Sequence, residues 1–198
     1  IKGQVFSVQP FYIAKYQITD RQFQSFLDDP EGYNNPAWWQ GLPEERWHHE
    51  VLPNQGQFPN LPRENVTWYQ AVAFTKWLTA HHLGEQLLSP NAPQLPSMII
   101  GENAQIRLPT EWEWQWAAQG GFAKREYPWE GKWDTHRVNS LESGLGETTA
   151  VGSYPGGAAV CGALDMAGNV WELCLSEYES LQMNTNNSAA RVVRGGSF

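Results

Sequence analysis

The sequence is poor in cysteine, with only Cys161 and Cys174 among 198 residues. Two cysteines exclude a disulfide-rich scaffold, and we expect each to be a free, buried thiol. Basic residues are also scarce, since 13 Lys and Arg stand against 21 Asp and Glu and leave a formal net charge of −8. A surface this acidic argues against nucleic acid as a partner, because phosphate binding needs clustered lysine and arginine.

Long apolar runs are missing as well. No stretch reaches the roughly 18 apolar residues of a transmembrane helix, so we expect no membrane span. The first residues, from Ile1 onward, carry no apolar signal-peptide core. Together with the two thiols, which lack the pattern of a disulfide framework, this favours a cytoplasmic location, with a mature secreted form as the alternative.

Tryptophan, glycine and proline are abundant instead, with 11, 18 and 13 copies. This composition fits a compact, loop-rich fold in which aromatic side chains and turns replace long regular elements. It does not fit a helical bundle. The length, with 41% hydrophobic and 17% charged residues, suits a folded chain with one core. We therefore expect residues 1–198 to form a single domain.

Three helices are predicted by the same N-terminal motif, the capping box. In this motif a threonine hydroxyl and a Gln or Glu side chain three positions later satisfy free backbone N–H groups at the helix start. The motif pairs Thr19 with Gln22, Thr67 with Gln70, and Thr110 with Glu113. Apolar residues at helical spacing follow the first two, and we expect the helices to end near residues 28–30, 84 and 120. The third carries tryptophan on more than one face, so we expect it to be enclosed.

The remaining segments are extended or irregular. Residues 4–18 are rich in β-formers, and Arg191–Arg194 has the pattern of a strand. Pro and Gly punctuate residues 30–66, 89–104 and 121–160, which we predict to be loops. Loops this long are usually functional or held by something else, such as a metal. Because a strand that ends in Gly-Gly-Ser-Phe is an unusual end for a domain, we expect further residues after Phe198.

Seven segments together resemble one family. In order, they are Phe11–Thr19, Asn65–Ala71, Ile106–Trp114, Tyr127–Trp129, Val151–Pro155, Leu164–Glu172 and Arg194–Phe198. The most specific are Gly-Asn-Val-Trp-Glu in the sixth segment and Arg-Gly-Gly-Ser in the last. Their order and spacing, over nearly the whole chain, are similar to those of the formylglycine-generating enzyme, or sulfatase-modifying factor, family.

The resemblance implies an α+β domain with an irregular C-type-lectin-like fold, which has few short strands, two to three flanking helices and long loops. The family includes copper-dependent oxidases that convert a sulfatase cysteine to formylglycine, and non-haem iron sulfoxide synthases of ergothioneine biosynthesis. It also includes non-catalytic paralogues and variable ligand-binding proteins of diversity-generating retroelements. Similar domains lie at the C-termini of bacterial kinases. The fold therefore does not fix the function.

The catalytic members need residues that this sequence does not show at matching positions. The resemblance places the two Cu(I)-binding cysteines of the oxidases after the Gly-Gly-Ser motif, whereas Cys161 and Cys174 precede it. The iron triad of the sulfoxide synthases comes mainly from an additional helical domain. The adjacent residues His48, His49 and Glu50 are poorly placed to face one metal ion. We therefore expect no catalytic residue within residues 1–198, and copper only if a cysteine pair follows them.

Calcium is the metal that the resemblance favours, with two structural sites. Such sites suit helix-free loops, because Ca²⁺ takes six to eight oxygen ligands, many of them backbone carbonyls. The alternative is that Asn169 and Glu172 only hydrogen-bond a tight turn. The implied ligands are Asn139, Ser140, Glu142 and Gly144 at the first site, and Gly168, Asn169, Val170 and Glu172 at the second.

The tryptophans divide into two groups. We expect five of them to lie in the core: Trp112, Trp114, Trp116, Trp129 and Trp171. Trp38, Trp39 and Trp47 fall in a long loop and are candidates to line a ligand groove, although anchoring the loop is the more common use of such residues.

Two functions from different classes follow. The first is a non-catalytic ligand- or protein-binding module on a calcium-stabilised scaffold, as in a retroelement variable protein, with the protein or small ligand bound at the C-terminal face. The second is a copper-dependent formylglycine-generating oxidase, or a related iron sulfoxide synthase, whose catalytic residues lie outside these 198 residues. A close pair of cysteines after Phe198 would favour the oxidase. A third possibility is a sensor or targeting domain of a larger signalling protein, which only the upstream sequence would show.

Overall fold

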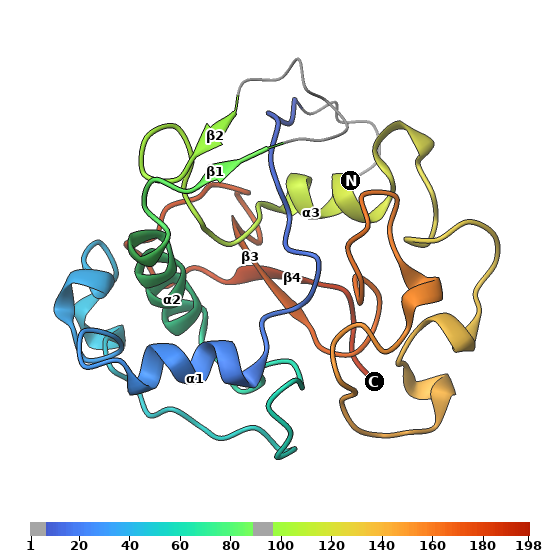
Figure 1. The fold of residues 1–198 in the computed structure, drawn as a ribbon, viewed down its shortest axis with the longest axis horizontal. Coiled ribbons are helices and arrows are strands. Elements are labelled where there is room, and N and C mark those ends of the chain that lie inside the picture. Colours follow the sequence, from blue (N-terminus) through green and yellow to red (C-terminus); the bar gives the residue numbers. More distant parts are fainter. Residues whose placement is uncertain (1–6, 89–96) are drawn as a thin grey trace.

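The computed structural model describes residues 7–88 and 97–198. In chain order its main elements are α1 (Asp20–Asp28), α2 (Trp68–His81), β1 (Gln86–Leu87), β2 (Met98–Ile99), α3 (Glu111–Ala118), β3 (Glu172–Glu177) and β4 (Arg191–Arg194). The strands form two small antiparallel sheets, β1–β2 and β3–β4. In Figure 1 the α1–α2 pair lies on one side of the β3–β4 ladder, and the yellow-to-orange loops lie on the other.

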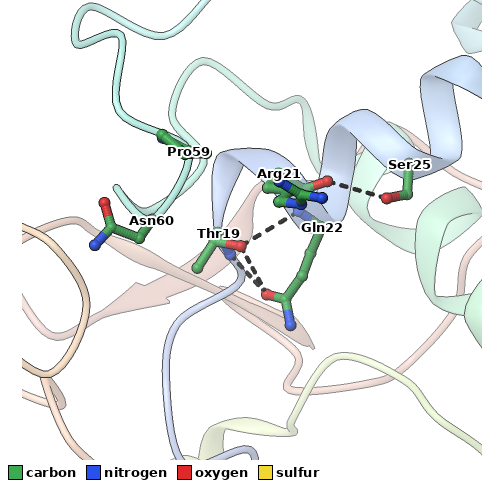
Figure 2. A pocket seen from close by; sticks show the side chains of 6 residues that line it. All are labelled: Thr19, Arg21, Gln22, Ser25, Pro59 and Asn60. Carbon is green, nitrogen blue, oxygen red and sulfur yellow. Dashed lines mark hydrogen bonds between the residues drawn. The ribbon is translucent and has the colours of Figure 1, made fainter.

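All three predicted capping boxes are present and set where the helices begin. Each threonine hydroxyl accepts the backbone N–H three residues later, and each Gln or Glu side chain accepts the N–H of the threonine. Figure 2 shows the box of Thr19 and Gln22 at the edge of a pocket of about 330 Å³ beside Pro59 and Asn60. The third helix has no exposed residue, as its tryptophans predicted.

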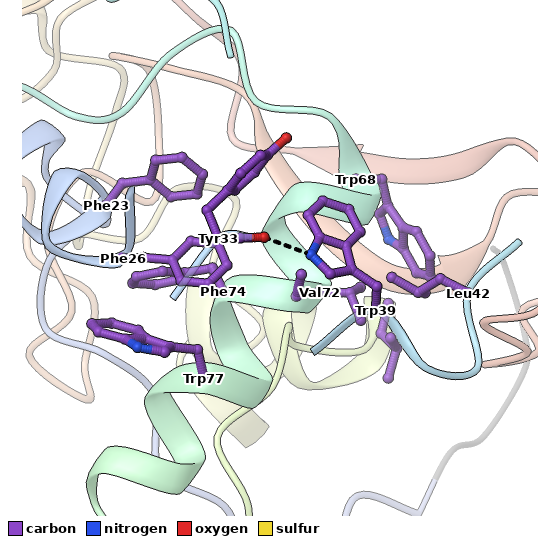
Figure 3. Packing of buried hydrophobic residues seen from close by; sticks show 11 residues of the cluster. Phe23, Phe26, Tyr33, Trp39, Leu42, Trp68, Val72, Phe74 and Trp77 are labelled. Carbon is purple, nitrogen blue, oxygen red and sulfur yellow. Dashed lines mark hydrogen bonds between the residues drawn. The ribbon is translucent and has the colours of Figure 1, made fainter. Parts of the chain in front are cut away.

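The main core lies between α1 and α2 and is built of aromatic rings (Figure 3). Phe26 is fully buried, and its ring makes edge contacts with Tyr33 and Phe74 at centroid distances of 5.6 and 5.8 Å. Edge-to-face contacts of this kind add to the stabilisation that the burial of each ring provides. The core residues are Phe23, Phe26, Tyr33, Trp39, Leu42, Trp68, Val72, Ala73, Phe74, Trp77 and Leu175.

A second, smaller core lies between α3 and the β3–β4 ladder. Its members are mostly small: Trp114, Ala117, Ala118, Ala159, Ala163, Met166, Cys174 and Val192. The indole N–H of Trp68 donates to the carbonyl of Cys174 at 2.9 Å, which ties α2 to β3. The guanidinium of Arg191 in β4 lies over the same indole, 3.9 Å from its centroid. The ladder therefore joins the two cores.

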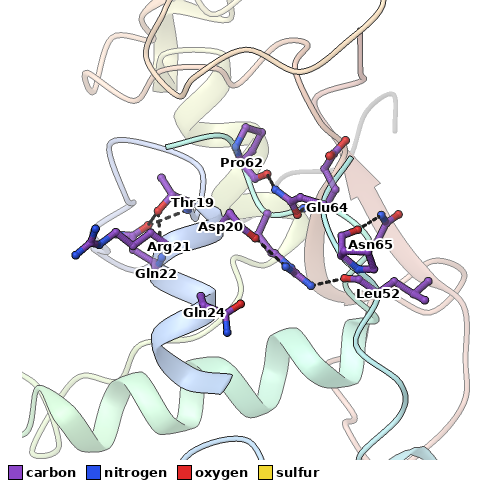
Figure 4. Close-up of polar contacts among 12 residues, drawn as sticks. Thr19, Asp20, Arg21, Gln22, Gln24, Leu52, Pro62, Glu64 and Asn65 are labelled. Carbon is purple, nitrogen blue, oxygen red and sulfur yellow. Dashed lines mark hydrogen bonds and ion pairs between the residues drawn. The ribbon is translucent and has the colours of Figure 1, made fainter. Parts of the chain in front are cut away.

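The long segment between α1 and α2 is held by polar contacts rather than by strands. The carboxylate of Asp20 forms an ion pair with the guanidinium of Arg63, with 2.8 Å between the nitrogen and the oxygen. The same guanidinium donates to the carbonyl of Leu52. Asn54 accepts the backbone N–H of Glu64 at 2.9 Å. Figure 4 shows these contacts around the start of α1. The predicted loop over residues 30–66 is confirmed, with two short 3-10 turns, Pro36–Trp39 and Glu44–Arg46.

Some sequence predictions need correction. Residues 7–18, the described part of the predicted extended segment, form no strand. The strand β4 is confirmed, but its partner β3 was not predicted. The predicted loop over 89–104 lies partly outside the described residues, and Met98–Ile99 within it is a strand. Trp171 is 58% exposed, because it precedes β3 without entering either core.

The Gly-rich segment over residues 121–160 contains only short 3-10 turns, as the absence of a helical period indicated: Gly121–Ala123, Thr135–Arg137, Leu141–Ser143 and Pro155–Gly157. Across residues 7–88 and 97–198, no helix combines the length and the apolar character that crossing a bilayer requires.

Candidate functional site

Asn169 is the residue on which three distant segments meet. Its side-chain oxygen accepts the backbone N–H of Thr149 at 2.9 Å and the amide of Asn139 at 3.2 Å. Its side-chain nitrogen donates to Gln17 and to the carbonyl of Thr149, both at 3.2 Å. Only 1% of the residue is exposed. Its backbone is left-handed, with φ 66°, a conformation that asparagine tolerates better than most residues.

The backbones at positions 139 and 168 touch. The N–H of Asn169 donates to the carbonyl of Asn139 at 2.8 Å. A Cβ at position 168 would lie 2.1 Å from that carbonyl oxygen, so Gly168 has no side chain for a steric reason. This contact brings the two predicted cation loops together, which spacing in the sequence did not show.

Gln17 reaches the second predicted cation site from the segment before α1. Its side-chain nitrogen donates to a carboxylate oxygen of Glu172 at 3.0 Å and to the carbonyls of Asp165 at 3.1 Å and Val170 at 3.4 Å. The other carboxylate oxygen of Glu172 accepts the indole N–H of Trp114 at 2.9 Å. Three chain segments therefore contribute polar groups to one partly buried point.

Gly195 closes this point from the C-terminal side. A Cβ there would lie 3.6 Å from the carbonyl oxygen of Val170, 3.7 Å from a carboxylate oxygen of Glu172 and 3.8 Å from the carbonyl oxygen of Met166. Glycine thus leaves space that oxygens line. We refer to the carbonyl oxygens of Asp165, Met166 and Val170 and the carboxylate of Glu172 as the oxygen cluster.

The oxygen cluster contains one carboxylate, and among the described residues no basic side chain forms an ion pair with it. Burial raises the pKa of Glu172 to about 7, and hydrogen bonds from Gln17 and Trp114 offset only part of that effect. Burial also raises the pKa of Asp165, against a 2.6 Å bond from the N–H of Gly152. Among the described residues, neither carboxylate takes part in an ion pair. A hard cation would therefore be favoured here.

The residues of the first predicted cation site lie together but bond to one another. The hydroxyl of Ser143 donates to the side-chain oxygen of Asn139 at 3.1 Å and to the carbonyl of Ser140 at 2.7 Å. The hydroxyl of Ser140 donates to Glu142 at 2.8 Å, which lowers the pKa of that exposed carboxyl. Gly144 follows in a left-handed conformation. Ser143 was not among the predicted ligands, although it belongs to the same turn.

The family of the chain follows from its sequence. Residues 3–198 match the model of the family described as the sulfatase-modifying factor enzyme 1-like domain. The chain belongs to this family. The match includes every residue of both cation loops and of the segment that carries Gln17.

Two relatives and one solved structure are similar to this sulfatase-modifying factor domain. It is 27% identical to a hercynine oxygenase of Mycobacterium tuberculosis over 231 residues, which cover 99% of the chain and 47% of that relative. It is 27% identical to a formylglycine-generating enzyme of Thermomonospora curvata over 243 residues, which cover 96% of the chain and 72% of the enzyme. The chain thus spans about half the length of the first relative.

Treponema denticola variable protein 1 shares its fold, with a TM-score of 0.56 and 24% identity over 91% of this chain and 70% of that chain. The predicted family and the mixed architecture of three helices and few short strands are therefore confirmed. At this identity the likeness concerns the fold alone.

The loop tryptophans of this sulfatase-modifying factor domain act as anchors. Trp39 is fully buried in the main core and donates to the carbonyl of Tyr33 at 2.9 Å. Trp38 and Trp47 are half-buried and donate to the carbonyls of Glu31 and Leu42 at 2.7 and 3.0 Å. Because Trp39 is fully buried, its side chain does not line an open groove. A ligand-binding role for Trp38 and Trp47 stays a prediction.

The two cysteines of the domain are free and occupy different environments. Cys174 is fully buried, as expected, and burial raises the pKa of its thiol to about 12. Cys161 is exposed, so the expectation of a buried thiol was wrong for it. Within the part of the chain that the structure describes, no three His, Cys, Asp or Glu side chains gather as a metal site would need.

Proposed function

We propose that this domain is a non-catalytic binding module whose C-terminal half is stabilised by Ca²⁺. The observation that carries the proposal is the oxygen cluster. Three backbone carbonyls and a half-buried carboxylate lie around a glycine that leaves them room, and among the described residues the carboxylate has no basic partner. Calcium prefers this mixture of carbonyl and carboxylate oxygens in irregular loops.

Glu172 and Val170 are the strongest candidates for ligands among the predicted set. Asn169 has a different part in the proposal, because its oxygen already accepts hydrogen bonds from Thr149 and Asn139. It orients the loop that presents Val170. The backbone carbonyls of Asp165 and Met166 are further candidate ligands, which the sequence analysis did not identify.

The first cation loop gives weaker support. Asn139 and Ser140 present two oxygens to one hydroxyl of Ser143, and a cation could take the place of that hydroxyl's proton. Glu142 is exposed and is the only carboxylate in the turn. We propose a second, weaker calcium site there.

The thiols of the described chain support a non-catalytic role. A metal-binding or nucleophilic cysteine must reach its thiolate form, and a pKa of about 12 keeps Cys174 protonated at neutral pH. Cys161 is exposed, and its sulfur lies 3.9 Å from the carbonyl of Ala117. No second thiol among the described residues joins it in a copper site.

Two surfaces offer room for a partner. Trp171 is 58% and Val193 44% exposed beside the β3–β4 ladder, and we propose that a protein or small ligand binds at this C-terminal face. A pocket of about 490 Å³ also lies between α2 and the segment before α3, with Met183 at its edge. Its size lies within the range of small-ligand sites, about 300–1,000 Å³.

The calcium part is tested by thermal unfolding of protein treated with EGTA and then supplied with Ca²⁺ or Mg²⁺. At 100-fold excess over Kd, bound calcium would add about 2.7 kcal/mol, which raises the Tm of a domain of this size by roughly 5–10 °C. The Glu172→Gln variant should lose most of this shift, while Glu179→Gln, an exposed control, should keep it. No shift in the wild-type protein at millimolar Ca²⁺ would refute a calcium-stabilised scaffold.

The binding part is tested by panning a displayed peptide library on the protein. Peptides selected for binding should lose affinity for the Trp171→Ala variant and retain it for Phe58→Ala, since Phe58 is 70% exposed on a different loop. Equal affinity for both variants would place binding elsewhere.

The second candidate function is a formylglycine-generating oxidase or hercynine oxygenase whose catalytic residues lie outside these 198 residues. The two relatives at 27% identity favour it, and both are longer than this chain. The assay is oxidation of a cysteine-containing peptide by the full-length protein loaded with Cu(I). Aldehyde product would establish the oxidase, whereas its absence would leave the binding module.

A further inference from the structure

We propose that the side-chain amide of Gln17 closes the oxygen cluster in place of a cation, and that a cation must displace this amide to bind. The inference rests on the proposed calcium site and concerns how that site is regulated. It makes Gln17 the residue that sets the calcium affinity of this domain.

The side-chain nitrogen of Gln17 contacts three acceptors of the oxygen cluster. Its nitrogen lies 3.0 Å from a carboxylate oxygen of Glu172, 3.1 Å from the carbonyl of Asp165 and 3.4 Å from that of Val170. An amide nitrogen has two protons, so three oxygens compete for two hydrogen bonds. The amide carries only a partial positive charge, and the carboxylate is left without a full counter-charge.

The orientation of the amide is fixed by the backbone. The N–H of Thr149 can only donate, so the Asn169 atom that faces it at 2.9 Å must be the side-chain oxygen. The side-chain nitrogen of Asn169 therefore faces Gln17, and the Gln17 atom that accepts from it at 3.2 Å must be the oxygen. The nitrogen of Gln17 is consequently directed at the oxygen cluster.

A cation among these oxygens would meet the two protons of Gln17. Turning the amide over would offer an oxygen to the cation, but it would place two N–H groups of Gln17 and Asn169 against each other. Gln17 must therefore swing out of the oxygen cluster. That movement breaks its hydrogen bonds, and their loss weakens cation binding.

Replacing Gln17 with glutamate would reverse this relation. One carboxylate oxygen would still accept from Asn169, and the other would face the cation as an additional ligand. Without a cation, the new carboxylate would lie against Glu172 and destabilise the domain. The variant should therefore gain calcium affinity and lose stability in the absence of calcium.

Sensitised terbium luminescence is a direct probe, because the indole of Trp114 donates to Glu172 and can transfer excitation to Tb³⁺ bound beside it. Tb³⁺ binding and its displacement by Ca²⁺ are measured for wild type, Gln17→Glu and Gln9→Glu. Gln9 is exposed in the same segment and provides the matched charge control. We expect Gln17→Glu to bind Ca²⁺ at least 10-fold more tightly, with a lower Tm in EGTA, and Gln9→Glu to match wild type.

The outcomes separate the inference from the proposed function. If wild type and Gln17→Glu bind Ca²⁺ equally, the calcium site stands and the role of Gln17 is overturned. If only Gln17→Glu binds, Gln17 is confirmed as the block and the wild-type calcium scaffold fails. If neither binds, both fail. Should Gln17→Glu not fold, Gln17→Ala removes the amide without adding charge, and a calcium-induced Tm shift no larger than that of wild type would overturn the inference.

Discussion

The α1–α2 half and the loops over residues 134–172 hold together by different means. The first buries aromatic rings against one another, with Phe26 and Trp39 fully enclosed. The second buries smaller apolar side chains and adds buried polar groups, among them Asn139, Asp165 and Asn169. Apolar burial involves no titratable group and no metal ligand, so it responds little to pH or to metal ions. A buried polar network depends on every partner being present, so the loops should carry the sensitivity of this domain to its surroundings.

The largest expected effect tests the aromatic half. Phe26→Ala should lower the free energy of unfolding by about 4 kcal/mol, because it removes a fully buried ring and leaves a cavity. Urea denaturation measures the loss, and Phe58→Ala, at an exposed position, should change stability by less than about 0.5 kcal/mol. The comparison of the two halves predicts that the loss is the same at pH 6 and pH 8.

The next effect tests the loops through pH. Burial raises the pKa of Glu172 to about 7 from the usual 4.5, so the folded state binds a proton more tightly than the unfolded state. The stabilisation this gives is complete below about pH 4.5 and is lost as the pH rises through 7. In EGTA, the free energy of unfolding should fall by about 3 kcal/mol between pH 4.5 and 8. Burial shifts Asp165 in the same direction.

Glu172→Gln provides the control for this pH dependence. A neutral amide does not titrate, so most of the slope between pH 5 and 8 should vanish, while the exposed Glu179→Gln variant keeps it. Saturating Ca²⁺ should also flatten the slope in wild type, since a bound cation favours the ionised carboxylate. An unchanged slope in Glu172→Gln would assign the pH dependence to other groups.

A smaller effect separates two contributions of Asn169 to stability, that of its hydrogen bonds and that of its backbone conformation. Asn169→Ala should cost about 2–3 kcal/mol, because Thr149 and Gln17 lose buried partners and alanine is strained at φ 66°. Asn169→Gly removes the same bonds without that strain, and should recover about 1 kcal/mol of the loss. Equal losses in chemical denaturation would show that strain contributes nothing.

The smallest effect should be alike at the starts of α2 and α3. Thr67→Ala and Thr110→Ala each remove one capping hydroxyl, and each should cost about 1 kcal/mol. The corresponding serine variants keep the hydroxyl and should retain most of the stability. A much larger loss at Thr110 would mean that the capping box of α3 also supports the second core.

What the sequence could predict was local. The three helices were found because a capping box lies within four residues, and β4 because its two adjacent valines favour a strand. The strand β3 was missed, since Glu172 and Glu177 at its ends do not suggest a strand that is buried. Residues 7–18 are β-formers that find no neighbouring strand.

The candidate site was predicted only in part, for the same reason. Resemblance brought forward Val170 and Glu172, whereas Gln17 and Asp165 were missed. Gln17 contacts Asp165, which lies 148 positions later in the sequence, and Glu172, which lies 155 positions later. No pattern of spacing encodes contacts of that range. They exist because the segment before α1 docks on residues 164–172, where the N–H of Leu164 donates to the carbonyl of Lys15 at 2.8 Å.

The long reach of Gln17 also has a consequence for the order in which the protein is made. All but one residue of the aromatic core lie between Phe23 and Trp77, so that half can collapse while the rest of the chain is still being synthesised. The polar groups of residues 15–17 must wait for Leu164, Asp165 and Glu172 to emerge. Closing so long a loop is slow. The segment before α1 is therefore synthesised well before the residues that it contacts, and it stays undocked and open to chaperones until they emerge.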